Sequence, residues 1–209
     1  MSNHPTLAIA ILAGGRARRM GGADKSRLPI DGRTILDRLL DATRPVAQHI
    51  FAVGDAHGAA AQAGLRVVPD LIADGGALGG IYTAILHSPC ERTLVLGCDM
   101  PFVTTAFMQH LATFIDADIV IPRTANGYQP LCAIYGRACA APIRGRLDRG
   151  ERHAAIPPEG VRVAEIGTGE LAAYDPDGLL FVNVNTPHDY AQAQQGLGRA
   201  GMPDAITDN

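Results

Sequence analysis

The stretch LAGGRARRMGGADK spans residues 12–25 and directly follows an apolar run at residues 7–11. An apolar run that leads into glycines and clustered cations is typical of a β-strand that delivers a phosphate-binding loop. Four glycines allow the backbone to approach a ligand closely, and four cations supply positive charge. The cations are Arg16, Arg18, Arg19 and Lys25. We therefore expect the loop to bind an anionic, nucleotide-type ligand, with Arg16 and Arg18 left open between phosphate contact and solvent.

Neither of the two best-known phosphate-binding loops fits this stretch. A Walker A loop requires glycine immediately before its lysine, where Asp24 stands, and Arg19 occupies the place of its first glycine. The dinucleotide fingerprint G-x-G-x-x-G requires its second glycine where Arg16 stands. The sequence therefore predicts a phosphate-binding loop of another kind.

The rest of the chain alternates between predicted strands and helices, which indicates an α/β fold with a mostly parallel sheet. The predicted strands cover residues 7–11, 48–54, 66–68, 93–97, 118–122, 129–135 and 179–184. The predicted helices lie at residues 35–40, 56–64, 81–87, 105–115 and 188–195. The strand at 129–135 needs no long crossover before it, so we expect it to pair antiparallel with a neighbour.

Two aspartates follow predicted strands and are candidate site residues. Asp70 ends one strand and precedes the glycine-rich segment DGGALGG at residues 74–80. Asp99 follows the all-apolar strand at 93–97, where a carboxylate needs a partner such as a hard divalent cation. The alternative for each is an aspartate that caps a helix or binds nearby backbone amides. The carboxyl ends of parallel strands meet at one edge, so we expect both aspartates beside the first loop.

Asn183 and Asn185 end the last predicted strand in the segment NVNTP. The two-residue period of a strand puts both on one side, with Val184 pointing away. Their amide oxygens are suited to completing a magnesium site, although asparagines at strand ends are also common turn formers.

The pattern L-A-G-G-x-x-x-R-M-G-G-x-D-K at residues 12–25 resembles the signature loop of the molybdenum cofactor guanylyltransferases, within the sugar-nucleotide pyrophosphorylase-like superfamily. The resemblance extends from residue 7 to about residue 190 and implies a three-layer, Rossmann-like nucleotidyltransferase fold in a single domain. Gly15 is similar to the guanylyltransferase branch and favours GTP over CTP or UTP. Ala77 departs from the family, which has proline there.

The resemblance implies GTP and Mo-molybdopterin as substrates, Mg²⁺ as cofactor, and the following roles. Lys25, Arg19 and Asp99 are the expected catalytic residues. The expected nucleotide-binding residues are Leu12, Ala13, Gly14, Gly15, Lys25, Asp70, Gly76, Leu78, Gly80 and Asp99. Asp99 and Asn185 are the expected metal ligands, and Asn183, Arg146 and Arg152 are candidates for binding the second substrate. We expect residues 1–196 to form the domain, with GTP bound by its N-terminal half and molybdopterin by its C-terminal half, and residues 197–209 to form a flexible tail.

The composition fits an ordinary globular protein of 209 residues, with 47% hydrophobic and 19% charged residues. A formal net charge of -3 argues against nucleic-acid binding, and no apolar run is long enough to span a bilayer. The four cysteines lack metal-site spacing and are expected to be small buried residues of a reducing compartment. We therefore expect a cytoplasmic protein that binds neither nucleic acid nor membrane. Molybdenum-insertion proteins and molybdoenzyme chaperones are the further partners that the resemblance suggests.

Two alternative functions remain open from the sequence. The chain could transfer CMP or a sugar-linked nucleotide within the same superfamily. It could also be a GTP- and molybdopterin-binding module without catalytic activity, although Lys25 and Asp99 argue against that.

Overall fold

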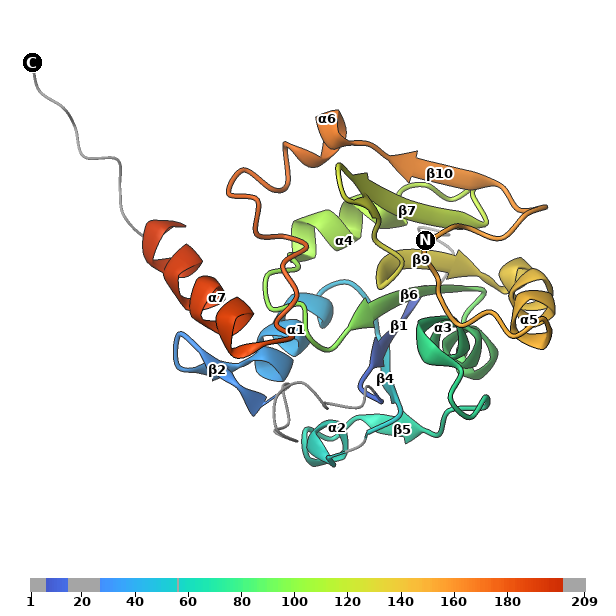
Figure 1. The fold of residues 1–209 in the computed structure, drawn as a ribbon, viewed down its shortest axis with the longest axis horizontal. Helices are drawn as coiled ribbons and strands as arrows, with labels where there is room; N and C mark the ends of the chain where they lie inside the picture. Colours follow the sequence, from blue (N-terminus) through green and yellow to red (C-terminus); the bar gives the residue numbers. More distant parts are fainter. Residues whose placement is uncertain (1–6, 15–26, 56, 201–209) are drawn as a thin grey trace, which may run out of the picture.

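A mostly parallel sheet forms the centre of the computed structural model, which describes residues 7–14, 27–55 and 57–200, with side chains up to residue 194. The strands lie in the order β10-β7-β9-β6-β1-β4-β5, and β8 pairs with β7 (Figure 1). They are β1 (Leu7–Leu12), β4 (His49–Val53), β5 (Arg66–Val68), β6 (Arg92–Gly97), β7 (Ile119–Thr124), β8 (Gly127–Tyr128), β9 (Cys132–Gly136) and β10 (Val163–Ile166). β9 runs antiparallel to β6 and β7, whereas β1, β4, β5 and β6 are parallel. The predicted α/β class and the antiparallel strand are confirmed.

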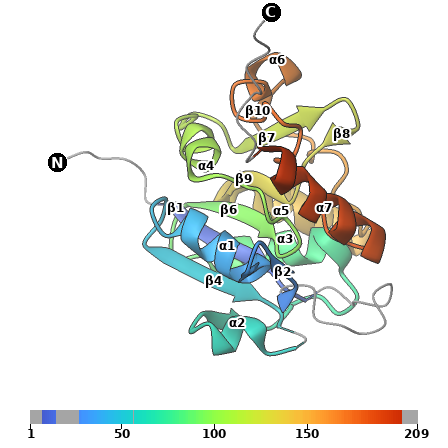
Figure 2. The same cartoon turned by 90° about the vertical axis from the view of Figure 1, so that its left-hand side faces the viewer.

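Helices cover both faces of this sheet and give three layers (Figures 1 and 2). One face carries α1 (Ile35–Thr43) and α4 (Thr105–Ala112), and the other carries α3 (Gly76–His87) and α5 (Ala140–Asp148). The shorter helices are α2 (Ala59–Gln62), η3 (Arg137–Cys139) and α6 (Thr168–Leu171), and α7 (Pro187–Ala200) comes last. Within the described ranges, every helix is too short or too polar to cross a bilayer.

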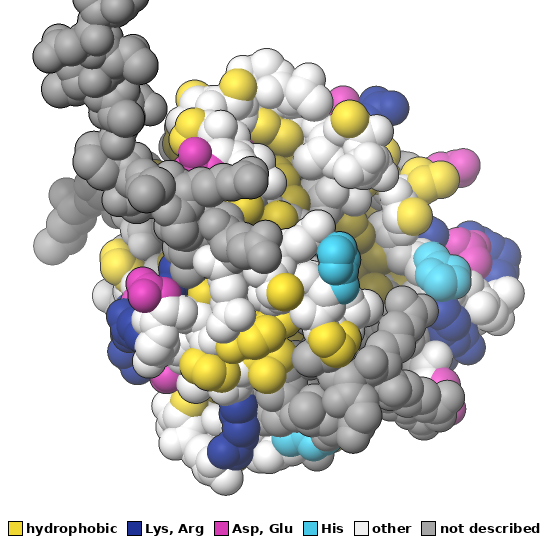
Figure 3. Space-filling view, turned by 60° about the vertical axis from the view of Figure 1, so that its left-hand side comes forward, with side chains coloured by type: hydrophobic (Ala, Val, Ile, Leu, Met, Phe, Trp, Pro, Cys, Tyr) yellow, Lys and Arg dark blue, Asp and Glu magenta, His cyan; other side chains and the backbone are white. Residues whose placement is uncertain are grey.

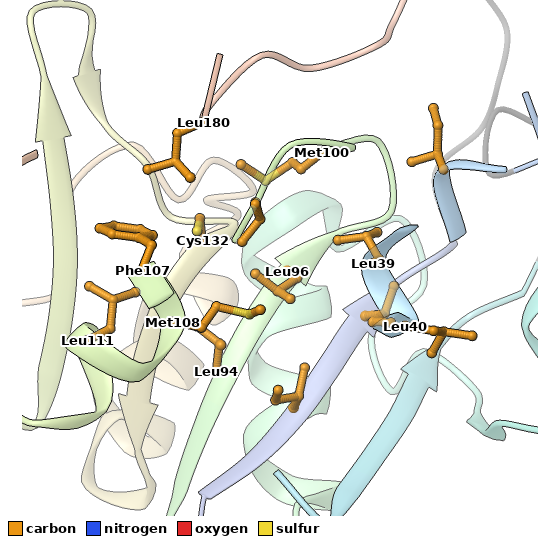
Figure 4. Close-up of a cluster of buried hydrophobic side chains, with 14 of the residues drawn as sticks. Leu39, Leu40, Leu94, Leu96, Met100, Phe107, Met108, Leu111, Cys132 and Leu180 are labelled. Atoms are coloured by element: carbon orange, nitrogen blue, oxygen red, sulfur yellow. The ribbon is translucent and has the colours of Figure 1, made fainter. Parts of the chain in front are cut away.

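The two hydrophobic cores follow from the two-residue period of the central strands. Ile9 and Ile11 of β1 face the core under α1 and α4, whereas Ala8 and Ala10 face the core under α3 and α5. Figure 4 shows the first core, in which side chains of α1, α4, β6 and β9 converge with Leu180. Small residues on the other face of β1 let α3 pack close to the sheet.

The segment 179–184 is not a strand, which corrects the prediction. Its backbone pairs with turns rather than with a neighbouring strand: Leu180 N donates to Asp175 Oδ1, and Val184 N donates to the Asp99 carbonyl oxygen, each at 2.9 Å. Phe181 meets the Phe107 ring edge-on at 5.6 Å. The apolar run therefore reflects packing against α4, not sheet formation.

The sequence pattern missed two strands of the sheet, β8 and β10, and a hairpin. β10 is an edge strand on which only Ile166 is buried, so it lacks a continuous apolar run. The small antiparallel hairpin of β2 (Pro29–Ile30) and β3 (Arg33–Thr34) turns at Asp31 and Gly32, which both have positive φ. An Asp-Gly pair is a strong hairpin signal, so this element could have been predicted.

Several boundaries also differ from those predicted. α3 starts at Gly76 rather than at residue 81, and β9 starts at Cys132 rather than at residue 129. The predicted helix at 56–64 is reduced to α2, whereas α7 extends to Ala200, beyond the predicted helix end at residue 195. Cys90, Cys132 and Cys139 are buried as expected, and Cys98 is partly buried. Burial raises the pKa of Cys132 and Cys139 to about 12.

Candidate functional site

The first part of the site is the end of β1, from which the glycine-rich loop leaves the sheet. Ala13 N donates to the Val53 carbonyl oxygen at 2.9 Å, and Cys98 N donates to the Leu12 carbonyl oxygen at 3.3 Å. These bonds fix Leu12 and Ala13 between β4 and β6. Gly15, Arg19 and Lys25 lie outside the described residues, so their roles stay predictions.

Gly14 packs against Gly54 and the carboxylate of Asp70. A Cβ atom on Gly14 would lie 2.9 Å from Asp70 Oδ2, and one on Gly54 would lie 2.6 Å from Gly14 Cα. Gly54 has a φ of +63° and donates its amide to the Val68 carbonyl oxygen at 2.9 Å. Only glycines allow this approach of three strand ends. The expected proximity of Asp70 to the first loop is therefore observed at the loop's first glycine, Gly14.

The pKa of the Asp70 carboxyl group is raised at this position. Partial desolvation by the surrounding backbone raises the pKa of Asp70 above its usual range. A carboxyl group with a raised pKa at a strand end is a recognised sign of a functional site. Gly54 is a further residue of this contact that the sequence motifs do not mark, although its place at the end of the predicted strand 48–54 is a signal that could have found it.

The second glycine-rich segment, residues 74–80, lies beside β1, as expected. Its residues differ from one another in what they contact. Gly80 allows α3 to pack on β1, since a Cβ atom there would lie 2.9 Å from Leu12 Cδ1. The Leu78 side chain is buried in the core. Gly76 and Asp74 adopt positive φ values of 61° and 51° at the start of the helix. Positive φ at the non-glycine Asp74 marks a strained turn of the kind that gathers at ligand sites.

Asp99 and the asparagine segment meet at a backbone hydrogen bond. Val184 N donates to the Asp99 carbonyl oxygen at 2.9 Å, and the Val184 side chain is fully buried. Asn183 is exposed and Asn185 is partly buried, on either side of this anchor. The Asp99 carboxylate lies over the end of β6, where a Cβ atom on Gly97 would come within 2.6 Å of Asp99 Oδ1. The structure thus places the backbone of the asparagine segment beside that of Asp99 without a strand.

A helix cap holds the asparagine segment. The amides of Asn185 and Thr186 donate to Asp189 Oδ2 at 2.9 and 2.8 Å, and Asp189 N donates to Thr186 Oγ1 at 3.1 Å. These bonds, chiefly that from the Asn185 amide, lower the pKa of Asp189. Reciprocal capping of this kind fixes the start of a helix, here α7.

The donor chemistry at Asp99 fits a hard divalent cation. Among the described residues, no three His, Cys, Asp or Glu side chains are grouped closely enough to hold a metal ion. One carboxylate and neighbouring amide oxygens can serve Mg²⁺, which commonly takes its remaining ligands from substrate phosphates and water. A metal bound here would therefore depend on a phosphate-bearing ligand.

The two arginines proposed for the second substrate lie in the α5 region. The Arg146 guanidinium donates to the Glu151 carboxylate and to the carbonyl oxygens of Ile156 and His153. Arg152 Nη1 donates to the carbonyl oxygens of Leu147 and Glu151. Both guanidinium groups thus bind carbonyl or carboxylate groups of residues 147–156.

A separate groove of about 700 Å³ lies between α1, the turn at residues 101–105 and the segment 174–180. Arg38 borders it and donates to the Pro101 carbonyl oxygen at 3.3 Å. On the molecular face drawn in Figure 3, basic and acidic side chains of the described residues are interspersed. The groove contains none of the predicted site residues.

Comparison with known proteins identifies relatives that match most of the chain. Residues 9–161 match the family model described as "MobA-like NTP transferase domain". The chain is 31% identical to a molybdenum cofactor guanylyltransferase of Desulfosudis oleivorans, over 90% of this chain and 94% of that protein. It is 34% identical to a probable molybdenum cofactor guanylyltransferase of Pelotomaculum thermopropionicum, over 88% and 90%.

A solved structure supports the same relationship. Molybdopterin-guanine dinucleotide biosynthesis protein A from Archaeoglobus fulgidus superposes with a TM-score of 0.75 at 25% identity, covering 92% of this chain and 99% of that one. The fold and the matched length agree, and we conclude that the chain belongs to the family of MobA-like NTP transferase domains.

Proposed function

We infer that the chain is a molybdenum cofactor guanylyltransferase, which transfers GMP from GTP to Mo-molybdopterin. A phosphate oxygen of the pterin attacks the α-phosphorus of GTP, the bond from that phosphorus to the β-phosphate bridging oxygen breaks, and pyrophosphate leaves. The observation that carries this inference is the match over nearly the whole chain to relatives named for this activity. Asp70, Asp99 and the asparagine segment at one sheet edge support it.

The reaction requires no nucleophilic side chain, so the protein acts by positioning two polyanions and neutralising charge. We propose that Lys25 and Arg19 hold the triphosphate, with Leu12, Ala13, Gly14 and Gly15 as the backbone of the loop. The first turn of α3, from Gly76 to Gly80, would lie along the nucleotide. Asp70, next to Gly14, would orient the nucleotide or its metal.

We propose Mg²⁺ as the cofactor, held by Asp99 together with Asn185. The ion would supply charge neutralisation at the phosphates. Asn183, which is exposed beside the same anchor, is available to the second substrate. The buried Val184 would keep both asparagines in register with Asp99.

The proposed cellular setting follows from the reaction and the composition. The protein would act in the cytoplasm, with GTP and Mo-molybdopterin as its small-molecule partners. Proteins that insert molybdenum or that deliver the finished cofactor are the proposed macromolecular partners.

Pyrophosphate release from a panel of GTP, CTP, UTP and ATP tests this function directly. Each nucleotide is supplied with Mg²⁺ and Mo-molybdopterin, and the dinucleotide product is identified by mass spectrometry. We expect turnover with GTP to exceed that with the other nucleotides at least tenfold. Preference for CTP would reassign the chain to cytidylyl transfer. GTP binding without pyrophosphate release would instead support the alternative of a binding module without catalytic activity.

A further inference from the structure

The start of α3 is capped by a carbonyl group from the C-terminal half of the chain. The N-cap residue of α3 is Gly75, and no side chain caps this helix. The first amides of a helix have no partner within it and need one from outside. Leu78 N donates to the Arg152 carbonyl oxygen at 3.2 Å, which fills that need. The glycine-rich segment and residues after α5 are therefore joined by backbone.

Gly76 brings this contact to the closest possible approach. Its φ is +61°, and a Cβ atom there would lie 2.8 Å from the Arg152 carbonyl oxygen and 3.2 Å from Arg152 Cβ. A side chain at residue 76 would push the two segments apart. The position of Arg152 thus limits where α3 can begin.

Arg146 fixes the segment at residues 151–156 that carries this carbonyl group. Its Nε donates to Glu151 Oε2 at 2.6 Å, Nη1 to the Ile156 carbonyl oxygen at 2.6 Å, and Nη2 to the His153 carbonyl oxygen at 3.0 Å. The side chain is only 15% exposed. A guanidinium group that uses three nitrogens on three acceptors holds a loop with defined geometry, which an ammonium group cannot reproduce.

Arg149 offers a matched comparison because it binds the same carboxylate from the solvent side. Its Nε and Nη2 donate to Glu151 Oε1 at 3.1 and 2.9 Å, and its side chain is 67% exposed. Exposed ion pairs of this kind contribute little. Arg149 thus carries the same charge near the same residue, but reaches none of the carbonyl groups that Arg146 binds.

We propose that Arg146 is a positioning residue for the nucleotide-binding segment: it holds residues 151–156 so that the Arg152 carbonyl group fixes the first turn of α3. The proposal rests on the proposed function, in which that turn lies along GTP. It replaces the expectation that Arg146 binds the pterin. Figure 1 shows α5, which carries Arg146, beside α3.

Hydrogen exchange tests the structural link without any substrate. In Arg146→Ala, we expect the Leu78 amide, measured by NMR, to exchange on the order of tenfold faster than in the wild type, because its acceptor is no longer fixed. Arg149→Ala should leave this rate within about twofold of the wild type. An unchanged Leu78 rate in a folded Arg146→Ala protein overturns the link.

GTP binding tests the consequence for the nucleotide. We expect the Kd for GTP with Mg²⁺ to rise on the order of tenfold in Arg146→Ala and almost as much in Arg146→Lys, which keeps the charge but loses the fork. The KM for Mo-molybdopterin should stay within about twofold in both variants. A raised KM for the pterin with normal GTP affinity, rescued by lysine, overturns the proposal in favour of direct pterin binding.

Failure of the proposed function is distinguishable from failure of this proposal. A wild-type protein that does not bind GTP contradicts the proposed function, whatever the exchange rates are. If Arg146→Ala does not fold, Arg146→Lys and Glu151→Gln carry the same two measurements, with a rise of about threefold expected for Glu151→Gln since it keeps a neutral acceptor. Rates and affinities like those of Arg149→Ala in both variants overturn the proposal.

Discussion

Asp70 lies at the edge of the sheet where the parallel strands end, and Asp118 lies at the edge where they begin. The pKa values of their two carboxyl groups are shifted in opposite directions. Asp70 follows the carboxyl end of β5, and Asp118 precedes the amino end of β7, which runs in the same direction. Desolvation raises the pKa of Asp70, whereas hydrogen bonds from Arg162 lower the pKa of Asp118 to about 2. Arg162 donates to Asp118 through its backbone N, Nε and Nη2, at 2.9, 3.1 and 2.9 Å.

The contrast extends to the other polar groups at the two edges. Arg92, at the start of β6, donates to the carbonyl oxygens of Ala112 and Phe114 at 3.1 and 2.8 Å. The Asp118 carboxylate and the two terminal nitrogens of Arg92 thus have protein partners at the amino edge, although the buried Arg92 Nε has none. At the carboxyl edge, Asp70 crowds Gly14, the first glycine of the predicted nucleotide loop. We infer that the carboxyl edge is arranged for a ligand and the amino edge for stability. Substitutions at the two edges should therefore separate activity from folding.

The largest expected effect is on activity, from Lys25→Ala in the predicted loop. Removing the proposed triphosphate clamp should lower kcat/KM for GTP on the order of 10²- to 10³-fold, which is about 2.7 to 4 kcal/mol of transition-state stabilisation. Thermal unfolding should be unchanged, since a loop cation contributes little to the core. Near-normal turnover in a folded Lys25→Ala protein would remove Lys25 from the site.

Asp99→Ala tests the metal at the same edge. We expect turnover to fall about 10²-fold and the stimulation by Mg²⁺ to weaken, because the carboxylate that would hold the ion is gone. The fold should persist, since Val184 is bound by the Asp99 backbone carbonyl group, which alanine keeps. Turnover is measured over a Mg²⁺ titration, with circular dichroism as the control. A variant whose Mg²⁺ dependence matches the wild type would exclude Asp99 as a ligand.

Arg92→Met tests the amino edge, with the opposite pattern expected. The substitution keeps much of the side-chain volume but removes two hydrogen bonds from a charged donor to the C-terminal end of α4. We expect a loss of about 2 to 3 kcal/mol in the free energy of unfolding, measured with urea, and a normal kcat at 25 °C. A stable variant with low activity would contradict the division between the two edges.

The sequence predicted those parts of the fold and site that are local. Apolar runs and glycine-rich turns gave the parallel strands and helices around β1, and their alternation implied that Asp70 and Asp99 share an edge. The contact of Gly14 with Gly54 and Asp70 could not be predicted, because it depends on the relative height of three strand ends. The sequence predicts Arg146 only as a candidate for binding the second substrate, and the carbonyl groups that its guanidinium contacts could not be predicted.

The failures of the strand prediction have a common physical cause. Apolar residues mark burial, and burial can come from a sheet or from packing of an irregular segment. Residues 179–184 are apolar because Leu180, Phe181 and Val184 pack beneath α4, while β10 is a true strand with an exposed edge. Even so, the alternate burial that a strand would give survives around Val184, which is buried between the exposed Asn183 and the partly buried Asn185.

The shifted pKa values of Asp70 and Asp118 give a further test of the difference between the two edges, through the dependence of stability on pH below neutrality. The folded pKa of Asp70 is raised above an unfolded value of about 3.9, so its contribution to stability is greatest at low pH and is lost as pH rises through the folded pKa. Asp70→Asn should therefore leave neutral-pH stability unchanged or slightly higher, while turnover falls about tenfold. Calorimetry and pyrophosphate release measure the two effects. A variant that is clearly less stable would mean that Asp70 supports the fold.

The smallest expected effect is that of Arg162→Ala on Asp118. The folded pKa of Asp118, about 2, lies below the unfolded value of about 3.9, so its stabilising contribution is present above pH 4 and is lost as pH falls toward 2. Removing the guanidinium should move the pKa of Asp118 upward, although the bond from the residue 162 amide remains.

Carboxyl NMR titration measures this shift in the pKa of Asp118. The control is Arg123→Ala, which affects the exposed ion pair with Glu165 instead. Because the Asp118 pair is exposed on the arginine side, we expect turnover and neutral-pH stability to change little. An Asp118 pKa that stays near 2 in Arg162→Ala would show that backbone amides alone set its acidity, and the two edges would then differ in backbone geometry rather than in charge pairing.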